Sequence, residues 1–315
     1  MKHVKPIDAP VIVGSMALDN VKTPAGEVTD SLGGAANYSA VAASFFTPVN
    51  LVGVIGDDFP QTHLDYLESR NIDLAGVDRI DGGKTFSWSG YYDFDLNIAH
   101  TTDTQLNVFA DFKPTLPDAY RKASYVFLAN IDPVLQLDVL NQVEKPRLTL
   151  CDTMNFWITS KRDALIEVLS RVDVAFMNDA EARQLTGCMS TIKAAKAIQK
   201  LGPKTVIVKK GEHGALLFHE DEHFSAPSYP LEDIVDPTGA GDSFAGGFIG
   251  YIASEGDITP KTMRRAVVYG SVMASFNVED FSLNRMRRLT PHHIAERYRK
   301  FKEIAYFEAM EEAVL

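Results

Sequence analysis

The segment DPTGAGDSFAGG, residues 236–247, combines a carboxylate with a run of very small residues. Asp242 directly follows Gly239, Ala240 and Gly241. Small residues leave backbone N–H groups uncovered, and the N-terminus of a helix adds partial positive charge, so this turn could hold a phosphate or another oxyanion. The acid itself could be a cap of the helix or a catalytic group.

A helix is predicted to follow the turn, over residues 242–254, because apolar residues recur there at helical spacing. The turn matches neither of two familiar phosphate-binding motifs. A dinucleotide-binding turn would need glycine where Phe244 stands, and a P-loop would need lysine where Gly247 stands. The spacing therefore argues against a dinucleotide oxidoreductase and against a P-loop enzyme.

The elements that must position this turn alternate along the chain. Short apolar runs predict buried strands at 11–14, 51–56, 125–129, 148–152, 174–178 and 205–211. Helical periodicity predicts helices at 35–46, 62–69, 161–169, 180–185, 191–200 and 261–277, besides the one at 242–254. This alternation predicts an α/β fold in which helices cover both faces of a mainly parallel sheet. A ligand is then expected outside the carboxyl ends of the strands.

Two stretches break the alternation. Residues 84–107 lack helical periodicity and are rich in aromatic residues and threonine, and residues 15–32 are short, polar and rich in turns. We expect a small β-sheet lid formed from about 15–32 and 84–112, on a single domain that spans 1–315. The alternative is a pair of long loops, which are uncommon in compact domains unless they are functional.

Composition limits the class of partner. The net charge is −11, so the chain gains nothing from counterion release on nucleic acid. A basic run at 285–300 is expected to be the solvated face of a C-terminal helix. Only two cysteines occur, and no apolar run has the length of a membrane span, which favours a cytoplasmic protein without a membrane partner.

The segment DPTGAGDSFAGGF closely resembles the C-terminal signature of the ribokinase-like, or PfkB, family of carbohydrate and nucleoside kinases. Three further segments resemble motifs of that family, and they run along most of the chain. They are SLGGAANYSAVAASFF at 31–46, NDAEARQLTG at 178–187 and VKKGEHGALLF at 208–218. The resemblance implies a three-layer αβα domain with a mainly parallel central sheet and a β-sheet lid.

The resemblance implies a role for each residue of the turn. Asp242 corresponds to the family's catalytic base, which accepts the proton of a hydroxyl as it attacks the γ-phosphate of ATP. The N–H groups of Gly239, Ala240 and Gly241 would meet the charge on the transferring group. Asp236 and Thr238 would organise the turn or the outer shell of a metal.

On the nucleotide side, Asn178 and Glu181 correspond to residues that hold Mg²⁺ through water, and a capping box is the alternative for this pair. Lys209 and Lys210 depart from the small or hydroxyl residue that the family often has; we expect one to reach phosphate and the other to face solvent. Three residues are expected near the nucleotide. Gly211 and Gly214 would shape the loop that binds it, and Asn277 would lie beside the adenine.

On the acceptor side, the resemblance implies that Asp19 binds substrate hydroxyls and that Gly33 and Gly34 let the substrate approach the backbone. The family's asparagine would fall at position 38, which is Tyr38 here, and Asn37 stands one residue early. Either Asn37 acts in a shifted register or Tyr38 stacks on a flat group, which would favour a nucleoside. Further pocket candidates are Asn130 and residues 152–155, at strand ends.

The expected activity is ATP-dependent phosphorylation of a hydroxymethyl group of a sugar, with a nucleoside as the alternative acceptor. The lid aromatics, Phe86, Trp88, Tyr91 and Tyr92, fit a nucleoside base, lid packing or a dimer contact. A non-catalytic nucleotide sensor of the same fold is an alternative of another class. We also expect Mg²⁺ as a cofactor and a homodimer through the lid, and activation by a monovalent cation stays open.

Overall fold

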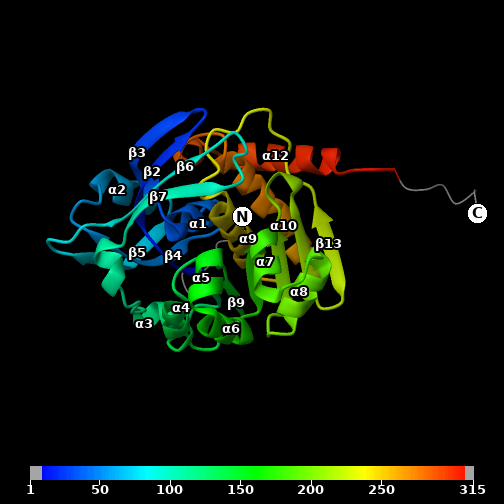
Figure 1. Ribbon diagram of the computed structural model, residues 1–315, viewed down its shortest axis with the longest axis horizontal. Coiled ribbons are helices and arrows are strands. Elements are labelled where there is room, and N and C mark those ends of the chain that lie inside the picture. The colour runs from blue at the N-terminus through cyan, green and yellow to red at the C-terminus, as the bar shows by residue number, and fades with distance from the viewer. Residues whose placement is uncertain (1–8, 309–315) are drawn as a thin grey trace, which may run out of the picture.

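The computed structural model describes residues 9–308 and contains two sheets (Figure 1). The central sheet has nine strands in the order β13-β12-β11-β10-β9-β8-β1-β4-β5. Its strands are β1 (Val11–Val13), β4 (Val49–Gly56), β5 (Ile72–Ile80), β8 (Tyr125–Leu128), β9 (Leu148–Cys151), β10 (Val174–Asn178), β11 (Thr205–Lys209), β12 (Ala215–His219) and β13 (Glu222–Ala226). All neighbours pair in parallel except β11 with β12 and β12 with β13.

Helices cover both faces of this sheet. One face packs against α1 (Ala35–Ala43), α9 (Ala240–Glu255), α10 (Pro260–Asn277) and α12 (Pro291–Ile304). The other packs against α3 (Asp118–Arg121), α4 (Pro133–Leu140), α5 (Asn155–Ser160), α6 (Arg162–Arg171), α7 (Asp179–Thr186) and α8 (Thr191–Gln199). The remaining helices are α2 (Gln61–Ser69), α11 (Asn284–Arg287) and the 3-10 turns η2 (Asn107–Asp111) and η3 (Gly211–His213). The predicted three-layer fold is confirmed.

The second sheet has four strands in the order β3-β2-β6-β7. They are β2 (Ala17–Thr23), β3 (Gly26–Gly33), β6 (Phe86–Tyr92) and β7 (Ala99–Gln105), drawn in blue and cyan in Figure 1. Strand β2 pairs in parallel with β6, and the other two pairs are antiparallel. The irregular stretches of the sequence therefore form a sheet and not a pair of loops.

The basic run near the C-terminus is not simply a solvated face. Arg285 and Arg297 both form ion pairs with Glu279, and the guanidinium of Arg297 lies 3.5 Å from the centroid of the Phe276 ring. These arginines fasten α11 and α12 to the end of α10. The expectation of a solvated stripe is therefore wrong for these two side chains.

Candidate active site

The glycine-rich turn leads directly into α9. Gly239 is the N-cap residue, with a left-handed φ of 76° that favours glycine, and Ala240 is the first helical residue. Asp242 lies in the first turn, and no side chain caps this helix. The simple capping role for Asp242 is therefore wrong. The N–H of Ala240 donates to the carbonyl of Pro237 at 3.2 Å, and the N–H groups of Gly239 and Gly241 are left for another acceptor.

Buried hydrogen bonds hold the turn in place. Asp236 accepts from the backbone N–H of Thr238 at 2.9 Å and from that of Ser282 at 3.2 Å. Asn277 donates to the carbonyl of Thr238 at 2.7 Å and accepts from the Ser243 hydroxyl at 3.0 Å. Asn277 is completely buried. The predicted adenine contact for Asn277 is thus wrong, because its amide is committed to the turn.

A buried ion pair lies beside the turn. Lys209, at the end of β11, places its Nζ 2.5 Å from Oδ2 of Asp152, the residue after β9. The same Nζ would lie 3.1 Å from a Cβ added at Gly241, so the ammonium adjoins the glycine-rich turn. Burial disfavours the charged ammonium, but Asp152 and Glu181 outweigh burial and raise the pKa of Lys209.

The acids around Lys209 are electrostatically linked. Burial and the charge of Asp152 raise the pKa of Asp242 to about 7, and Lys209 acts in the opposite direction. Burial likewise raises the pKa of Glu181 to about 7, with Lys209 again opposing it. Both carboxyl groups therefore change charge near neutral pH, and Lys209 favours their ionised forms.

Asn178 and Glu181 form the capping box at the start of α7. The Asn178 side chain accepts from the Glu181 N–H at 2.8 Å, and Glu181 Oε2 accepts from the Asn178 N–H at 2.7 Å. Glu181 Oε1 is not used by the box, so the structural role does not exclude a second one. Within residues 9–308, no three His, Cys, Asp or Glu side chains are grouped to bind a metal directly. Hard oxygen donors in this arrangement fit Mg²⁺ held through water.

Asp19, the residue expected to bind the acceptor, lies in β2. Its carboxylate accepts a hydrogen bond from the backbone of Gly34, while burial and the charge of Asp236 raise its pKa to about 8. A Cβ at Gly33 would lie 2.0 Å from Asp19 Oδ2. Gly33 is therefore small because the carboxylate fills that space. The sequence predicts that the substrate approaches the backbone at Gly33, but in the structure the Asp19 carboxylate occupies that position.

Asn37 and Tyr38 are both buried in α1. Asn37 donates to the carbonyl of Gly33 at 2.7 Å, and a Cβ at Gly239 would lie 2.3 Å from the Tyr38 ring. The Tyr38 ring therefore packs on the glycine-rich turn, and its predicted stacking on a substrate is wrong. Its hydroxyl has no hydrogen-bond partner within residues 9–308. Burial and then Asp19 raise its pKa well above the usual value, so the hydroxyl stays protonated.

The inner face of the lid carries a flat aromatic ring beside Asp19. Asp19 pairs with Trp88 across the parallel β2–β6 ladder, so the two side chains share a face of the sheet. A Cβ at Gly90 would lie 2.4 Å from Cζ2 of Trp88, so the indole lies against bare backbone at Gly90. Trp88 Nε1 donates to the Thr101 hydroxyl at 3.2 Å, which fixes the plane of the ring.

Tyr92 continues the same face of β6 and reaches the turn. The Thr238 hydroxyl donates to the Tyr92 hydroxyl at 3.3 Å. Beyond Tyr92, the Asn97 side chain lies 2.9 Å from the position of a Cβ at Gly211, which has a φ of 54°. The lid thus spans from the acceptor side to the loop expected to bind nucleotide.

The remaining predicted residues lie near strand ends. Asn130, just after β8, accepts from Trp157 Nε1 at 3.0 Å, so part of its amide is already used. Gly214 has a φ of 85°, and its carbonyl accepts from the Lys210 N–H at 2.8 Å. These bonds shape the 211–214 loop. Lys210 is half-buried.

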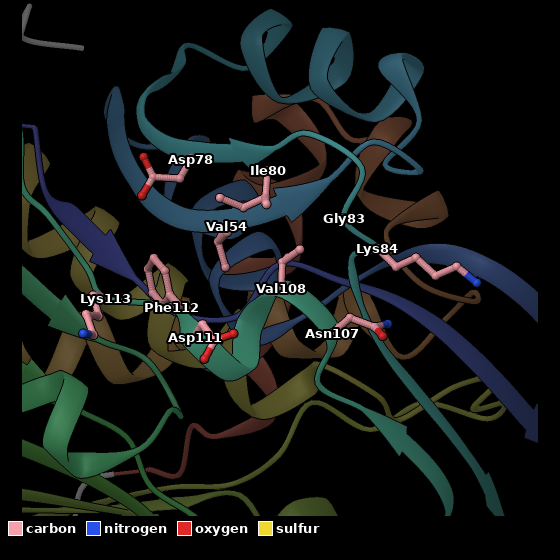
Figure 2. Close-up of a pocket in the computed structure, with 10 residues that line it drawn as sticks. All are labelled: Val54, Asp78, Ile80, Gly83, Lys84, Asn107, Val108, Asp111, Phe112 and Lys113. Carbon is pink, nitrogen blue, oxygen red and sulfur yellow. The ribbon is translucent and has the colours of Figure 1, made fainter.

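A separate cleft of about 540 Å³ lies at the base of the lid (Figure 2). It lies between strand β4, the edge strand β5 and the turn η2, and its lining includes Asp78, Lys84, Val108 and Phe112. None of the predicted site residues lines it. The cleft is therefore separate from the residues around Asp242.

The chain belongs to the pfkB family of carbohydrate kinases, whose model matches residues 9–287. It is therefore a phosphotransferase with an alcohol group as acceptor, and the family resemblance of its motifs is confirmed. No helix in the described part is long and apolar enough to cross a membrane.

Named relatives extend this comparison. The chain is 34% identical over 244 residues to a cytidine kinase of Thermococcus kodakarensis, covering 76% of this chain and 86% of the relative. A nucleoside kinase of Burkholderia thailandensis in complex with inosine has a TM-score of 0.73 at 19% identity, covering 93% of this chain and 98% of that one. A ribokinase-fold protein of E. coli in complex with ATP and Mg²⁺ has a TM-score of 0.78 at 18% identity, covering 93% and 99%.

Proposed function

We propose that this kinase transfers the γ-phosphoryl group of ATP to the hydroxymethyl group of a nucleoside. The observation that carries the proposal is the Trp88 indole, which lies against Gly90 on the lid face that also holds Asp19. A carboxylate beside a flat ring suits a molecule with ribose hydroxyls and a planar base. A bare sugar would use Asp19 and leave the indole without a stacking partner.

The comparisons support a nucleoside over a sugar. The relative that is 34% identical is a cytidine kinase, and a nucleoside kinase with bound inosine has the same fold. Because the fold is shared by kinases of several acceptors, the fold alone does not choose among them. The flat lid face provides the independent argument, and pyrimidine nucleosides are the first acceptors to test.

The proposed mechanism uses the turn and its neighbouring acid. Asp242 accepts the proton of the hydroxymethyl group as its oxygen attacks the γ-phosphorus, and the bond from phosphorus to the bridging oxygen breaks to release ADP. The N–H groups of Gly239 and Gly241 hold the charge of the transferring group, while the N–H of Ala240 donates to the Pro237 carbonyl and shapes the turn. Asp19 orients the acceptor through its ribose hydroxyls.

Lys209, Asn178 and Glu181 serve the donor side of the proposed reaction. Lys209 adjoins the turn at Gly241 and offers a positive charge to the phosphates. Asn178 and Glu181 would hold Mg²⁺ through water, and the ion would neutralise charge on the phosphates when bound. Gly211 and Gly214 would shape the loop against the nucleotide. We also propose that two copies of the chain associate through their lids.

A selectivity measurement with Trp88→Leu tests the proposed acceptor. Base–aromatic stacking contributes about 1–3 kcal/mol, so we expect kcat/KM for cytidine to fall about 5- to 150-fold. The value for D-ribose should stay within about twofold of wild type, because ribose makes no stacking contact. Tyr91→Leu is the matched control, since Tyr91 is an exposed neighbour on β6 that stacks on His100.

The wild-type enzyme is expected to prefer nucleosides over free sugars in the same assay. Equal use of ribose and cytidine by wild type would contradict the nucleoside proposal. An equal loss for both acceptors in Trp88→Leu would show that the indole only stabilises the lid.

A further inference from the structure

The lid touches the main domain at two places on the far side of the acceptor region. Tyr92 ends β6 and receives the hydrogen bond from Thr238, and Asn97, in the β6–β7 loop, lies against Gly211. Figure 1 places this cyan loop beside the yellow segment that leads into α9. The β6–β7 hairpin therefore reaches both the catalytic turn and the neighbouring loop.

Thr238 is the residue through which the lid can act on the turn. Its N–H donates to Asp236, its carbonyl accepts from Asn277, and it directly precedes Gly239, the N-cap of α9. Its backbone is thus fixed from the main domain, while its hydroxyl points to the lid. A contact at the Thr238 hydroxyl therefore restrains the residue that precedes Gly239 and orients the N–H groups proposed to bind the phosphoryl group.

The Tyr92 hydroxyl is suited to a fixed, neutral contact. Burial raises the pKa of Tyr92 to about 12, with further raising by Asp236 and Asp19. The hydroxyl therefore stays protonated at neutral pH. Because Thr238 donates to its oxygen, the proton of Tyr92 is directed away from Thr238.

We propose that Tyr92 is a positioning residue that links the lid to the catalytic turn through Thr238. With the lid on the site, the hydrogen bond holds Thr238 and the following N–H groups in the arrangement that receives the phosphoryl group. With the lid off, the turn loses this support, and phosphoryl transfer to water or to the acceptor slows. The inference rests on the proposed role of the 236–243 turn in phosphoryl transfer.

Tyr92→Phe tests this proposal by amide hydrogen exchange of residues 236–243, which needs no substrate. One hydrogen bond contributes about 0.5–1.5 kcal/mol, so exchange in this segment should become about 2- to 10-fold faster in the variant. Tyr91→Phe is the control, because Tyr91 is an exposed neighbour on the same strand and stacks on His100. The control should exchange at the wild-type rate.

Kinetics give the second readout of the same variants. We expect kcat for phosphoryl transfer to cytidine to fall about 2- to 10-fold in Tyr92→Phe, with KM for cytidine changed less than twofold. Thr238→Val should give the same change, and the double variant should be no worse than either single one, because both remove one contact. Additive losses would overturn the proposed link.

The outcomes separate this proposal from the proposed function. Wild-type exchange rates at 236–243 in Tyr92→Phe would overturn the positioning role, whatever the activity. The wild-type protein could also transfer no phosphoryl group to any acceptor, while exchange is still faster in Tyr92→Phe. That result would support the contact between Tyr92 and Thr238 and contradict only the proposed function.

Discussion

At the scale of single residues, the site depends on one buried cation among three acids. The ammonium of Lys209 pairs with Asp152, adjoins the turn at Gly241 and lowers the pKa of both Asp242 and Glu181. A general base must be ionised to accept a proton, and Asp242 has a pKa of about 7. Lys209 therefore helps to keep the proposed base active at neutral pH.

Lys209→Met should move the pH dependence of the enzyme upward. The acidic limb of kcat/KM is expected near pH 7 in wild type, since activity is lost as Asp242 gains a proton. Without the lysine, burial and the charge of Asp152 still raise the pKa of Asp242, and the lowering effect of Lys209 is lost, so the limb shifts to higher pH. Rates measured from pH 5.5 to 9 with saturating ATP check this.

Lys210→Met provides the matched control for that shift. Lys210 is the next residue in the chain and is half-buried, and its backbone N–H donates to the Gly214 carbonyl. The pH profile of Lys210→Met should therefore follow that of wild type. An unchanged limb in Lys209→Met, or the same shift in both variants, would contradict the electrostatic role of Lys209.

At the scale of elements, the lid has two open edges. Strand β7 pairs only with β6, and nearly all its residues are exposed. Large apolar side chains at the tip are also exposed, with Phe94 at 93% and Ile98 at 58%. Exposed edge strands pair readily with other chains unless they are covered, which favours association of two lids.

The lid association predicts a dimer in solution. Light scattering at micromolar concentration should give twice the chain mass of 34.7 kDa. Thr102→Lys, which adds a charge to the exposed β7 edge, should lower the dimer fraction. The mass of a single chain at every concentration would rule out the lid dimer.

At the scale of the whole molecule, the sequence predicts the central sheet better than its edges. Strands β10 and β11 are continuous apolar runs because helices bury them on both faces. The edge strand β5 alternates polar and apolar residues and is half exposed, so no such run marks it. The helix at Pro133–Leu140 also has no clear apolar stripe and was not predicted.

The site was predictable where local chemistry fixes it and not where distant packing does. The position of Asp242 and the bare turn follow from residues within one segment. The roles of Asn277 and Tyr38 depend on contacts with residues about 40 and 200 positions away in the chain, namely Thr238 and Gly239. Gly90 was the overlooked signal for Trp88, because a glycine inside a strand indicates close approach of another group.

Phosphoryl transfer from ATP to cytidine by wild type and Asp242→Asn tests the proposed role of Asp242 as the catalytic base. We expect wild type to form a nucleoside monophosphate, and the variant to lose about 10²- to 10⁴-fold in kcat, the usual contribution of a general base. Nucleotide affinity, measured separately by calorimetry, should change little. Near-normal turnover by Asp242→Asn would show that this carboxylate does not take the proton of the acceptor.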